Sequence, residues 1–141
     1  MNDSVAVVGI GCRFPGGASS PEAFWRLLSD GVDAITETPS DRWSLEKFYS
    51  PDKVRPGKTQ SRWGGYVDGI DRFDPQLFGI SPKEASGMDP QQRMLLEVAW
   101  RAFEDAGQPL QNVAGRDVSV YVGISSFDYA VAGLSPQDRG V

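Results

Sequence analysis

The residues able to do chemistry in this chain of 141 residues are few, and Cys12 is the first of them. Cys12 follows an apolar run, and the neighbouring Arg13 would favour a thiolate there. A cysteine nucleophile also needs a base, and the chain contains no histidine. No predicted helix begins behind Cys12 to add its dipole. We therefore interpret Cys12 as a buried or half-buried structural residue rather than a nucleophile.

The aspartates at positions 68, 71 and 74 are a second candidate, either as an acid–base pair or as a metal site. They lie in a loop between Gly65 and Pro75, with Arg72 near enough to pair with them. Aspartates in such loops usually accept hydrogen bonds from the local backbone, and we favour that interpretation. With no histidine and one cysteine, zinc is not expected, and the aspartate spacing misses the calcium-loop pattern.

Two further patterns partly match the motifs of known sites, one for dinucleotide binding and one for a hydrolase serine. Gly9 and Gly11 follow an apolar run, and an aspartate comes about 20 residues later, as in a dinucleotide-binding fingerprint. However, Phe14 stands at the third glycine position, and Pro15 blocks the helix that should hold the pyrophosphate. The Ser125–Ser126 pair also follows an apolar run, but it lacks the Gly-x-Ser-x-Gly frame of hydrolases. A nucleotide-dependent enzyme remains an alternative that rests on Gly9-x-Gly11 alone.

The charge and the cysteine content indicate which classes of binding partner and which cellular compartment to expect. The net charge of −5 and the scattered basic residues disfavour binding to nucleic acid. The richest basic run, residues 53–62, is interpreted as a solvated loop. A single cysteine cannot form an internal disulfide, and the N-terminus lacks the features of a signal peptide or a membrane span. We expect a cytoplasmic protein without a membrane partner.

Two apolar runs predict the strands that would position these residues. Residues 4–10 and 118–124 are rich in valine and isoleucine, which is typical of strands. The continuous apolarity of residues 4–10 further indicates a strand covered on both faces. A helix is predicted from Pro21, with Ser19 or Ser20 as its cap and Gly31 at its end.

Two more helices are predicted from their caps. Ser81 and Glu84 form a capping box for a short helix that ends near Gly87. Asp89 caps a longer helix, with a variant of the same box, that runs to about residue 106 and stops at Gly107. The apolar stripe of this long helix is so wide that we expect other elements to cover all but a narrow ridge of it.

The middle of the chain has weaker patterns. Residues 32–74 combine many glycines and prolines with six aromatic residues, which predicts an ordered, irregular excursion pinned to the core by its rings. The chain is long enough to bury a real core, and the order of its elements predicts an α/β fold. Residues 130–141 are predicted to begin a loop.

Together these segments resemble the front of a β-ketoacyl synthase (ketosynthase) domain of modular type I polyketide synthases. The resemblance is carried by the Met-Asp-Pro-Gln-Gln-Arg helix from Met88, by the Cys-Arg-Phe-Pro-Gly-Gly loop from Cys12, and by residues 21–31, 64–74, 78–85 and 120–129. It implies a thiolase-like layered α/β fold that is incomplete here, with residues 1–141 as the front part of its first half.

The resemblance also implies a function. It implies an acyltransferase that extends an acyl thioester with a malonyl-type unit by decarboxylative Claisen condensation. It further implies a phosphopantetheine-bearing acyl carrier protein as partner, the remainder of the domain, and a homodimer in the parent protein. No cofactor is expected to bind this segment itself.

The sequence departs from the family pattern in one decisive way. The family's nucleophilic cysteine and its two histidines normally lie beyond Val141, so the chain resembles roughly the first third of the domain. Cys12 matches a non-catalytic family position, and we predict no catalytic residue and no activity for the chain alone. An alternative is a non-catalytic interaction module that pairs with a second chain supplying the rest of the fold. The resemblance also implies one region close to a site. In the family, the acyl pocket and the dimer contact lie near the region that matches Gly123, Ile124, Ser125, Ser126 and Phe127.

Overall fold

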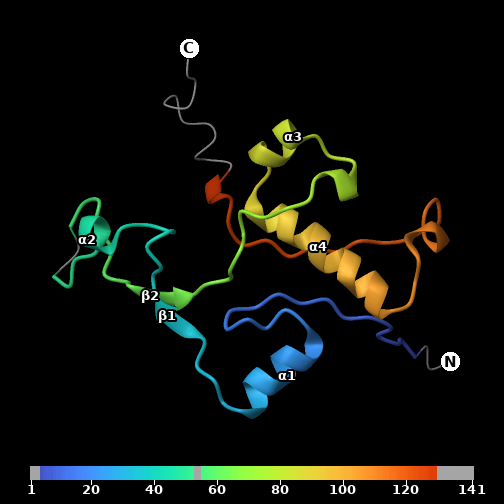
Figure 1. Cartoon of the computed structure of the whole chain (residues 1–141), viewed down its shortest axis with the longest axis horizontal. Coiled ribbons are helices and arrows are strands. Elements are labelled where there is room, and N and C mark those ends of the chain that lie inside the picture. Colours follow the sequence, from blue (N-terminus) through green and yellow to red (C-terminus); the bar gives the residue numbers. More distant parts are fainter. Residues whose placement is uncertain (1–3, 53–54, 130–141) are drawn as a thin grey trace. The chain divides into compact units, whose positions relative to one another are not determined.

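A computed structural model describes residues 4–52 and 55–129 of the chain (Figure 1). They divide into two compact units, which we call unit 1 (residues 4–10 and 70–129) and unit 2 (residues 11–69). Unit 1 contains two α-helices and two 3₁₀ helices, whereas unit 2 contains two α-helices and a two-stranded sheet. The predicted loop at residues 130–141 lies outside the described residues.

In unit 2, helix α1 (Pro21–Ser29) confirms the predicted start at Pro21. The side chain of Ser20 accepts the backbone N–H of Ala23, which satisfies one of the unpaired donors of the first turn. At the other end, the Gly31 N–H donates to the Leu28 carbonyl and the Val32 N–H to the Leu27 carbonyl. This pair of bonds is a Schellman motif, and Gly31 supplies the left-handed backbone that it needs, with φ of 63°.

In unit 1, helix α3 (Pro82–Gly87) begins with the predicted capping box in full. Helix α4 (Pro90–Asp105) begins with Asp89, whose carboxylate accepts the backbone N–H of Gln91. The side-chain amide of Gln91 also donates to the Asp89 carboxylate, at 3.2 Å. The predicted capping-box variant assigns this return contact to the next residue, Gln92. Gly107 then ends α4 in a second Schellman motif, with N–H groups of Gly107 and Gln108 donating to the carbonyls of Glu104 and Phe103.

The surroundings of α4 differ from the prediction. We expected other elements to cover all but a narrow ridge of this helix, yet none of its residues is buried. The extended segment 4–10 reaches it near its C-terminal end, and the 3₁₀ helix η1 (Gln76–Phe78) reaches it through Phe78, whose ring meets Trp100 edge-on. Leu95 remains exposed on the apolar stripe. The prediction was wrong for the described residues because too few elements are present to cover a stripe this wide.

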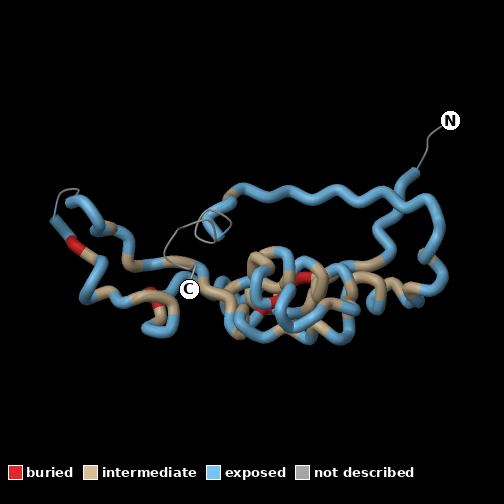
Figure 2. The backbone as a smooth tube through the Cα atoms, turned by 90° about the horizontal axis from the view of Figure 1, so that it is seen from above, coloured by how far each residue is buried: buried red, intermediate tan, exposed pale blue. Residues whose placement is uncertain are grey.

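The two predicted strands are extended but belong to no sheet within the described part of the chain. Figure 2 shows residues 118–124 as exposed throughout, and Val5 in the first segment and Tyr121 in the second are 94% and 92% exposed. A strand needs a neighbour for its backbone groups and cover for its side chains. The described chain supplies neither, so the two predicted strands do not form within it, and the predicted cover of residues 4–10 on both faces is wrong for these residues.

The sheet that does form lies in the excursion of unit 2, where none was predicted. Strands β1 (Ile35–Glu37) and β2 (Trp63–Gly65) pair antiparallel, with Ile35 opposite Gly65 and Glu37 opposite Trp63. The buried Thr38 follows β1, and its hydroxyl lies 2.6 Å from the hydroxyl of Tyr66. Between the strands lies the short helix α2 (Leu45–Phe48).

Five of the six rings of the excursion lie in unit 2, and the sixth, Phe73, lies in unit 1. Trp43 and Phe48 meet edge-on with centroids 6.3 Å apart, and the Arg62 guanidinium lies 5.2 Å from the ring centre of Tyr49. The excursion is therefore ordered by its rings, as predicted. The contacts in unit 2 join the excursion to itself, whereas the Phe73 ring stacks on Phe78 with centroids 5.2 Å apart, and Phe78 in turn meets Trp100 of α4.

The described residues contain no large core. Their buried hydrophobic side chains are small ones, those of Cys12, Ala18 and Ala85, and no large side chain among them is fully buried. The expectation of a real core was therefore wrong for residues 4–52 and 55–129. Among these residues, helix length and apolarity nowhere reach what a membrane crossing requires.

Candidate functional site

The structure buries Cys12, as the interpretation of a buried or half-buried structural residue expects. Its neighbour Arg13 directs its guanidinium elsewhere, because Nη2 donates to the carbonyl oxygens of Asp68 and Gly69 at 2.7 and 3.0 Å. A buried thiol is poorly accessible to an acyl thioester, so the geometry offers Cys12 no role as a nucleophile.

The glycine that imitates a nucleotide fingerprint has a packing role instead. A Cβ atom on Gly9 would lie 2.2 Å from the carbonyl oxygen of Ala102 and 2.7 Å from the Cβ atom of Ala106, both on or next to α4. The next backbone N–H, that of Ile10, donates to the Asp105 carboxylate at 2.8 Å. Gly9 is therefore required where the extended segment crosses the helix, and no phosphate is needed to explain it.

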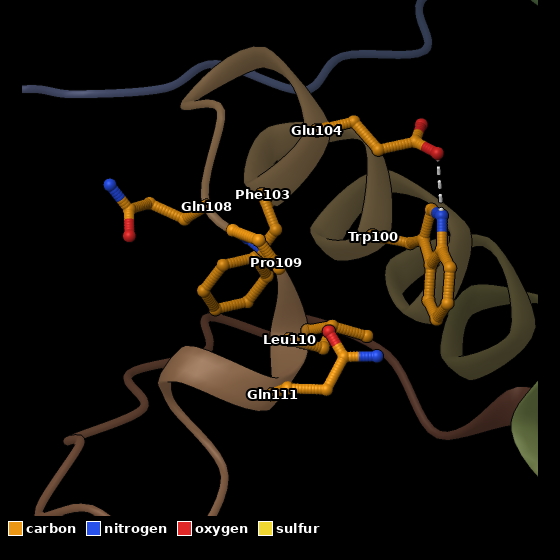
Figure 3. Close-up of a pocket in the computed structure, with 7 residues that line it drawn as sticks. All are labelled: Trp100, Phe103, Glu104, Gln108, Pro109, Leu110 and Gln111. Atoms are coloured by element: carbon orange, nitrogen blue, oxygen red, sulfur yellow. Dashed lines mark hydrogen bonds between the residues drawn. The ribbon is translucent and has the colours of Figure 1, made fainter.

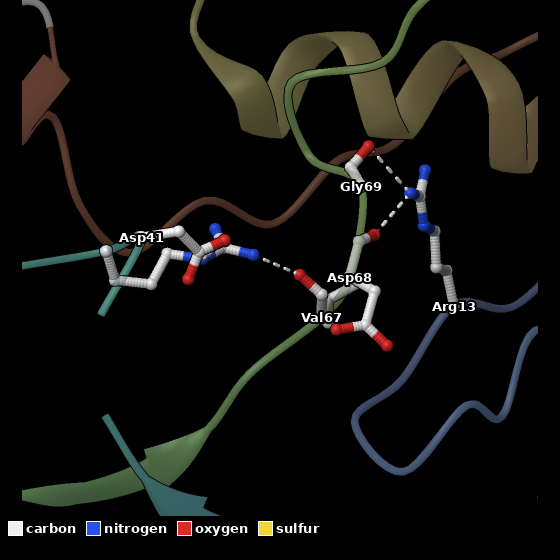
Figure 4. Close-up of polar contacts among 6 residues, drawn as sticks. Arg13, Asp41, Val67, Asp68 and Gly69 are labelled. Atoms are coloured by element: carbon white, nitrogen blue, oxygen red, sulfur yellow. Dashed lines mark hydrogen bonds and ion pairs between the residues drawn. The ribbon is translucent and has the colours of Figure 1, made fainter. Parts of the chain in front are cut away.

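Asp74 makes the local backbone contacts that the turn interpretation predicted. The Asp74 carboxylate accepts the N–H groups of Gln76 and Leu77 at the start of η1. Figure 4 shows Arg13 reaching the backbone of Asp68 and Gly69, while the Arg42 guanidinium donates to the Val67 carbonyl. Among the residues that the structure describes, no group of three or more potential ligands is placed to hold a metal ion.

Residues 123–127, the predicted neighbourhood of an acyl pocket or dimer contact, end the second extended segment. Phe127 is 68% exposed and Ile124 is exposed as well, whereas Ser126 is half-buried. The segment is anchored just beyond this point, because the Tyr129 hydroxyl donates to the Ser86 carbonyl at 3.1 Å. The pocket role of these residues stays a prediction.

Unit 1 contains an apolar hollow that was not predicted from the sequence, and we call it the Trp100 hollow. It has a volume of about 340 Å³. Two smaller hollows of about 180 and 170 Å³ also reach Trp100. The main one is lined by Leu77, Phe78, Leu96, Ala99, Trp100, Phe103 and Leu110.

The chemistry of the Trp100 hollow is that of a packing surface. Figure 3 shows the neighbouring hollow of about 180 Å³, which shares Trp100, Phe103 and Leu110 with the Trp100 hollow. There the Trp100 indole N–H donates to the Glu104 carboxylate at 2.8 Å. The Trp100 hollow itself can accommodate an apolar group, but none of the residues that line it is a nucleophile or a base. The wide stripe of α4 was the sequence signal, but three lining residues come from η1 and η2 (Leu110–Asn112), whose approach to α4 cannot be read from periodicity.

Glu84 is the titratable group whose surroundings change its behaviour most clearly. The hydroxyl of Ser81 donates to its carboxylate at 2.7 Å and the backbone N–H of Ser81 at 3.1 Å. These two bonds favour the charged form and lower the pKa of Glu84 below its ordinary value. Because they belong to a capping box, the shift indicates a helix start rather than catalysis.

Comparison with known proteins gives a consistent result. The family model described as "Beta-ketoacyl synthase, N-terminal domain" matches residues 2–140. A phenolphthiocerol/phthiocerol polyketide synthase polypeptide of Mycobacterium tuberculosis is 52% identical over 132 residues, covering 94% of this chain and 7% of that protein. The polyketide synthase GfsA of Streptomyces halstedii is 50% identical over 128 residues, covering 90% of this chain and 2% of that protein.

Solved structures agree with the sequence relatives. The ketosynthase from module 6 of the bacillaene synthase of Bacillus subtilis matches with a TM-score of 0.80 and 36% identity, covering 92% of this chain and 21% of that one. The oxazolomycin ketosynthase domain of Streptomyces albus matches with a TM-score of 0.74 and 38% identity, covering 80% of this chain and 20% of that one. The matched region thus spans about a fifth of these solved chains.

These matches explain why so few side chains of the described residues are buried. The described segments follow the backbone of a thiolase-like ketosynthase domain, but only a part of that fold is present. The buried cysteine, the closely packed Gly9 and the absence of histidine are all compatible with a scaffold region that carries no reactive group of its own. The chain belongs to the β-ketoacyl synthase family and represents the N-terminal portion of a ketosynthase domain of the polyketide synthase type.

Proposed function

We propose that a complete domain with these residues at its front catalyses decarboxylative Claisen condensation in polyketide synthesis. The observation that carries the proposal is the identity of 52% to a polyketide synthase over 94% of this chain. In this reaction a cysteine thiolate takes the acyl group from a thioester and releases the carrier thiol. A malonyl-type unit then loses CO₂, and its carbanion attacks the acyl thioester, which frees the cysteine again.

The proposal assigns partners as well. The extender unit would be carried on the phosphopantetheine of an acyl carrier protein, and the complete domain would act as a homodimer. Residues 123–127 would lie near the acyl pocket and the dimer contact. The single cysteine, which cannot form an internal disulfide, supports a reducing cytoplasmic location for the protein.

The chain by itself is proposed to be inert. It contains no histidine, and its only cysteine is buried. The test compares the isolated chain with a ketosynthase domain that carries this sequence at its front, using mass spectrometry of acyl loading and release of CO₂ from a malonyl carrier. The domain should load and decarboxylate, and the isolated chain should do neither.

Cys12→Ser supplies the matched control for this experiment. The variant domain should load acyl groups as well as the unaltered domain, because the reactive cysteine would be a different one. Acyl transfer to Cys12 in the isolated chain, or loss of loading in the Cys12→Ser domain, would overturn the proposal.

A second candidate function is an interaction module that pairs with a second polypeptide supplying the rest of the fold. The exposed apolar segments at residues 4–10 and 118–124 favour it, since unpaired strand edges promote association. A well-behaved monomer in light scattering at high concentration would count against this candidate. Recovery of acyl loading after mixing with a polypeptide that carries the remaining part of a ketosynthase would support it.

A further inference from the structure

The second extended segment, residues 118–124 of unit 1, has an open strand edge. It belongs to no sheet, and among the residues that the structure describes no hydrogen bond reaches its backbone groups. The segment is exposed along its whole length (Figure 2). A row of unpaired N–H and C=O groups is a template on which another strand can add. The segment therefore has the backbone chemistry to accept a partner strand.

The side chains of this segment favour an identical strand as that partner. The segment carries no charged residue, so two copies can lie together without like charges meeting. Successive side chains of a strand alternate between two faces, and the even-numbered ones share a face. That face is apolar throughout and consists of Val118, Val120, Val122 and Ile124. All four are exposed, Val120 to 80%, and an antiparallel pair of copies would bring them together.

The charged residues that flank the segment select one register. Arg116 comes shortly before it and Asp128 shortly after it, and both residues are exposed. In an antiparallel pair centred on Val122, Arg116 of each copy lies opposite Asp128 of the other, because the two are equally far from Val122 in the sequence. The same register places Val120 opposite Ile124. A shift by two residues, the next register that keeps the apolar faces together, would leave both charges without a partner.

We propose that the chain pairs with a second copy of itself through residues 118–124, antiparallel and centred on Val122. Backbone hydrogen bonds join the two segments, and two contacts between Arg116 and Asp128 flank them. The partner is an identical chain, unlike the interaction module considered above, whose partner supplies the rest of the fold. The pairing does not depend on the proposed condensation chemistry, so measurements of acyl loading neither support nor weaken it.

Disulfide cross-linking of the full chain tests the register. The variants also carry Cys12→Ser, so that the introduced thiol is the only one. Residues directly opposite in an antiparallel pair have Cα atoms about 4.5–5.5 Å apart, which a disulfide can span, so Val122→Cys should cross-link to a dimer. Tyr121→Cys is the matched control, because this register places it diagonally from its copy at about 7–8 Å, too far for the bond. Random collisions would favour this control position, because Tyr121 is 92% exposed.

Charge reversal tests the flanking contacts. Sedimentation velocity over a range of concentrations should show a monomer–dimer equilibrium. Arg116→Asp places like charges opposite Asp128 and should weaken the dimer about tenfold. Combining Arg116→Asp with Asp128→Arg should restore the original dissociation constant. Arg72→Asp makes the same charge change at an exposed residue of the same unit and should leave the constant unchanged.

Several outcomes would overturn the proposed pairing. Cross-linking of Tyr121→Cys as fast as that of Val122→Cys would indicate a parallel stack or random collision. A chain that stays monomeric at every concentration, or that forms fibrils in place of a dimer, would also contradict it. So would a charge-swapped double variant that pairs no more tightly than Arg116→Asp alone.

Discussion

At the scale of single residues, two glycines and a carboxylate decide local geometry in this protein. Gly9 allows the extended segment 4–10 to touch α4, and Gly107 allows α4 to end in a Schellman motif. Glu84 closes the capping box of α3. In each case the residue is required for a reason that can be expressed as a distance or a backbone angle.

Replacing Gly9 with alanine should loosen the contact between segment 4–10 and α4. The added Cβ atom would meet the backbone of Ala102 and the side chain of Ala106 closer than real contacts allow, and such overpacking costs about 1–3 kcal/mol. The measurement is the exchange rate of the Ile10 amide, which should rise. Gly87→Ala is the control, because that glycine has open space around its Cβ position. Equal effects from both variants would contradict the packing role of Gly9.

The capping box should make the start of α3 depend on pH. The pKa of Glu84 is lowered from an ordinary value of 4.5 by its bonds from Ser81, so its stabilising effect is complete above that value. The effect is lost as the pH falls through the lowered pKa, because the protonated carboxyl no longer accepts both bonds well. The Ser81 amide resonance should therefore shift over this acidic range, and it should stay flat in Glu84→Gln. A titration that is the same in the variant would assign the shift to another group.

At the scale of elements, the helices are specified mainly by their ends. Helices α1 and α4 both begin at a proline that follows a side-chain cap, and both end in a Schellman glycine. These signals are local, since each involves residues within about five positions of one another. Helix α4 can therefore begin and end at its caps even though none of its residues is buried.

Gly107→Ala should shorten or fray the end of α4. The backbone at this position has φ of 60°, where an alanine costs about 1 kcal/mol relative to glycine. Faster exchange of the Gln108 amide, which donates to the Phe103 carbonyl, would show the loss. Gly87→Ala again serves as the control, because its φ is not positive and alanine favours the helix there. An unchanged Gln108 amide would mean that the motif does not hold the helix end.

At the scale of the whole molecule, the described residues have too little buried apolar surface to specify a core of their own. Only small hydrophobic side chains are buried among them, while the valine-rich extended segments are open to water. Because the solved ketosynthases extend well beyond the matched region, the missing cover can be supplied by the remainder of the domain.

A charge placed on the second extended segment should distinguish the isolated chain from the complete domain. Val120 is 80% exposed here, so Val120→Asp should leave the helix content of the isolated chain unchanged in circular dichroism. In a ketosynthase domain that carries this sequence, the same change should bury a charge and cost more than about 3 kcal/mol of unfolding free energy. Val120→Thr, which keeps the shape, should cost less. A domain that tolerates Val120→Asp would show that this segment stays exposed in the complete fold.

The sequence alone determined the local features of this protein and its family. The caps of α1, α3 and α4, the burial of Cys12 and the turn role of Asp74 could all be read from the chain, because each depends on neighbouring residues or on residue type. The order of the motifs led to the ketosynthase family for a similar reason.

Only the tertiary structure decided the features that depend on residues far apart in the chain. The fit of Gly9 against α4, the hydrogen bonds from Arg13 to residues 68–69, the pairing of β1 with β2 and the Trp100 hollow each join segments whose approach no periodicity reveals. The cover of residues 4–10 on both faces was predicted wrongly for the same reason. An apolar pattern shows that a segment is suited to burial, but whether it is buried depends on which other segments are present to cover it.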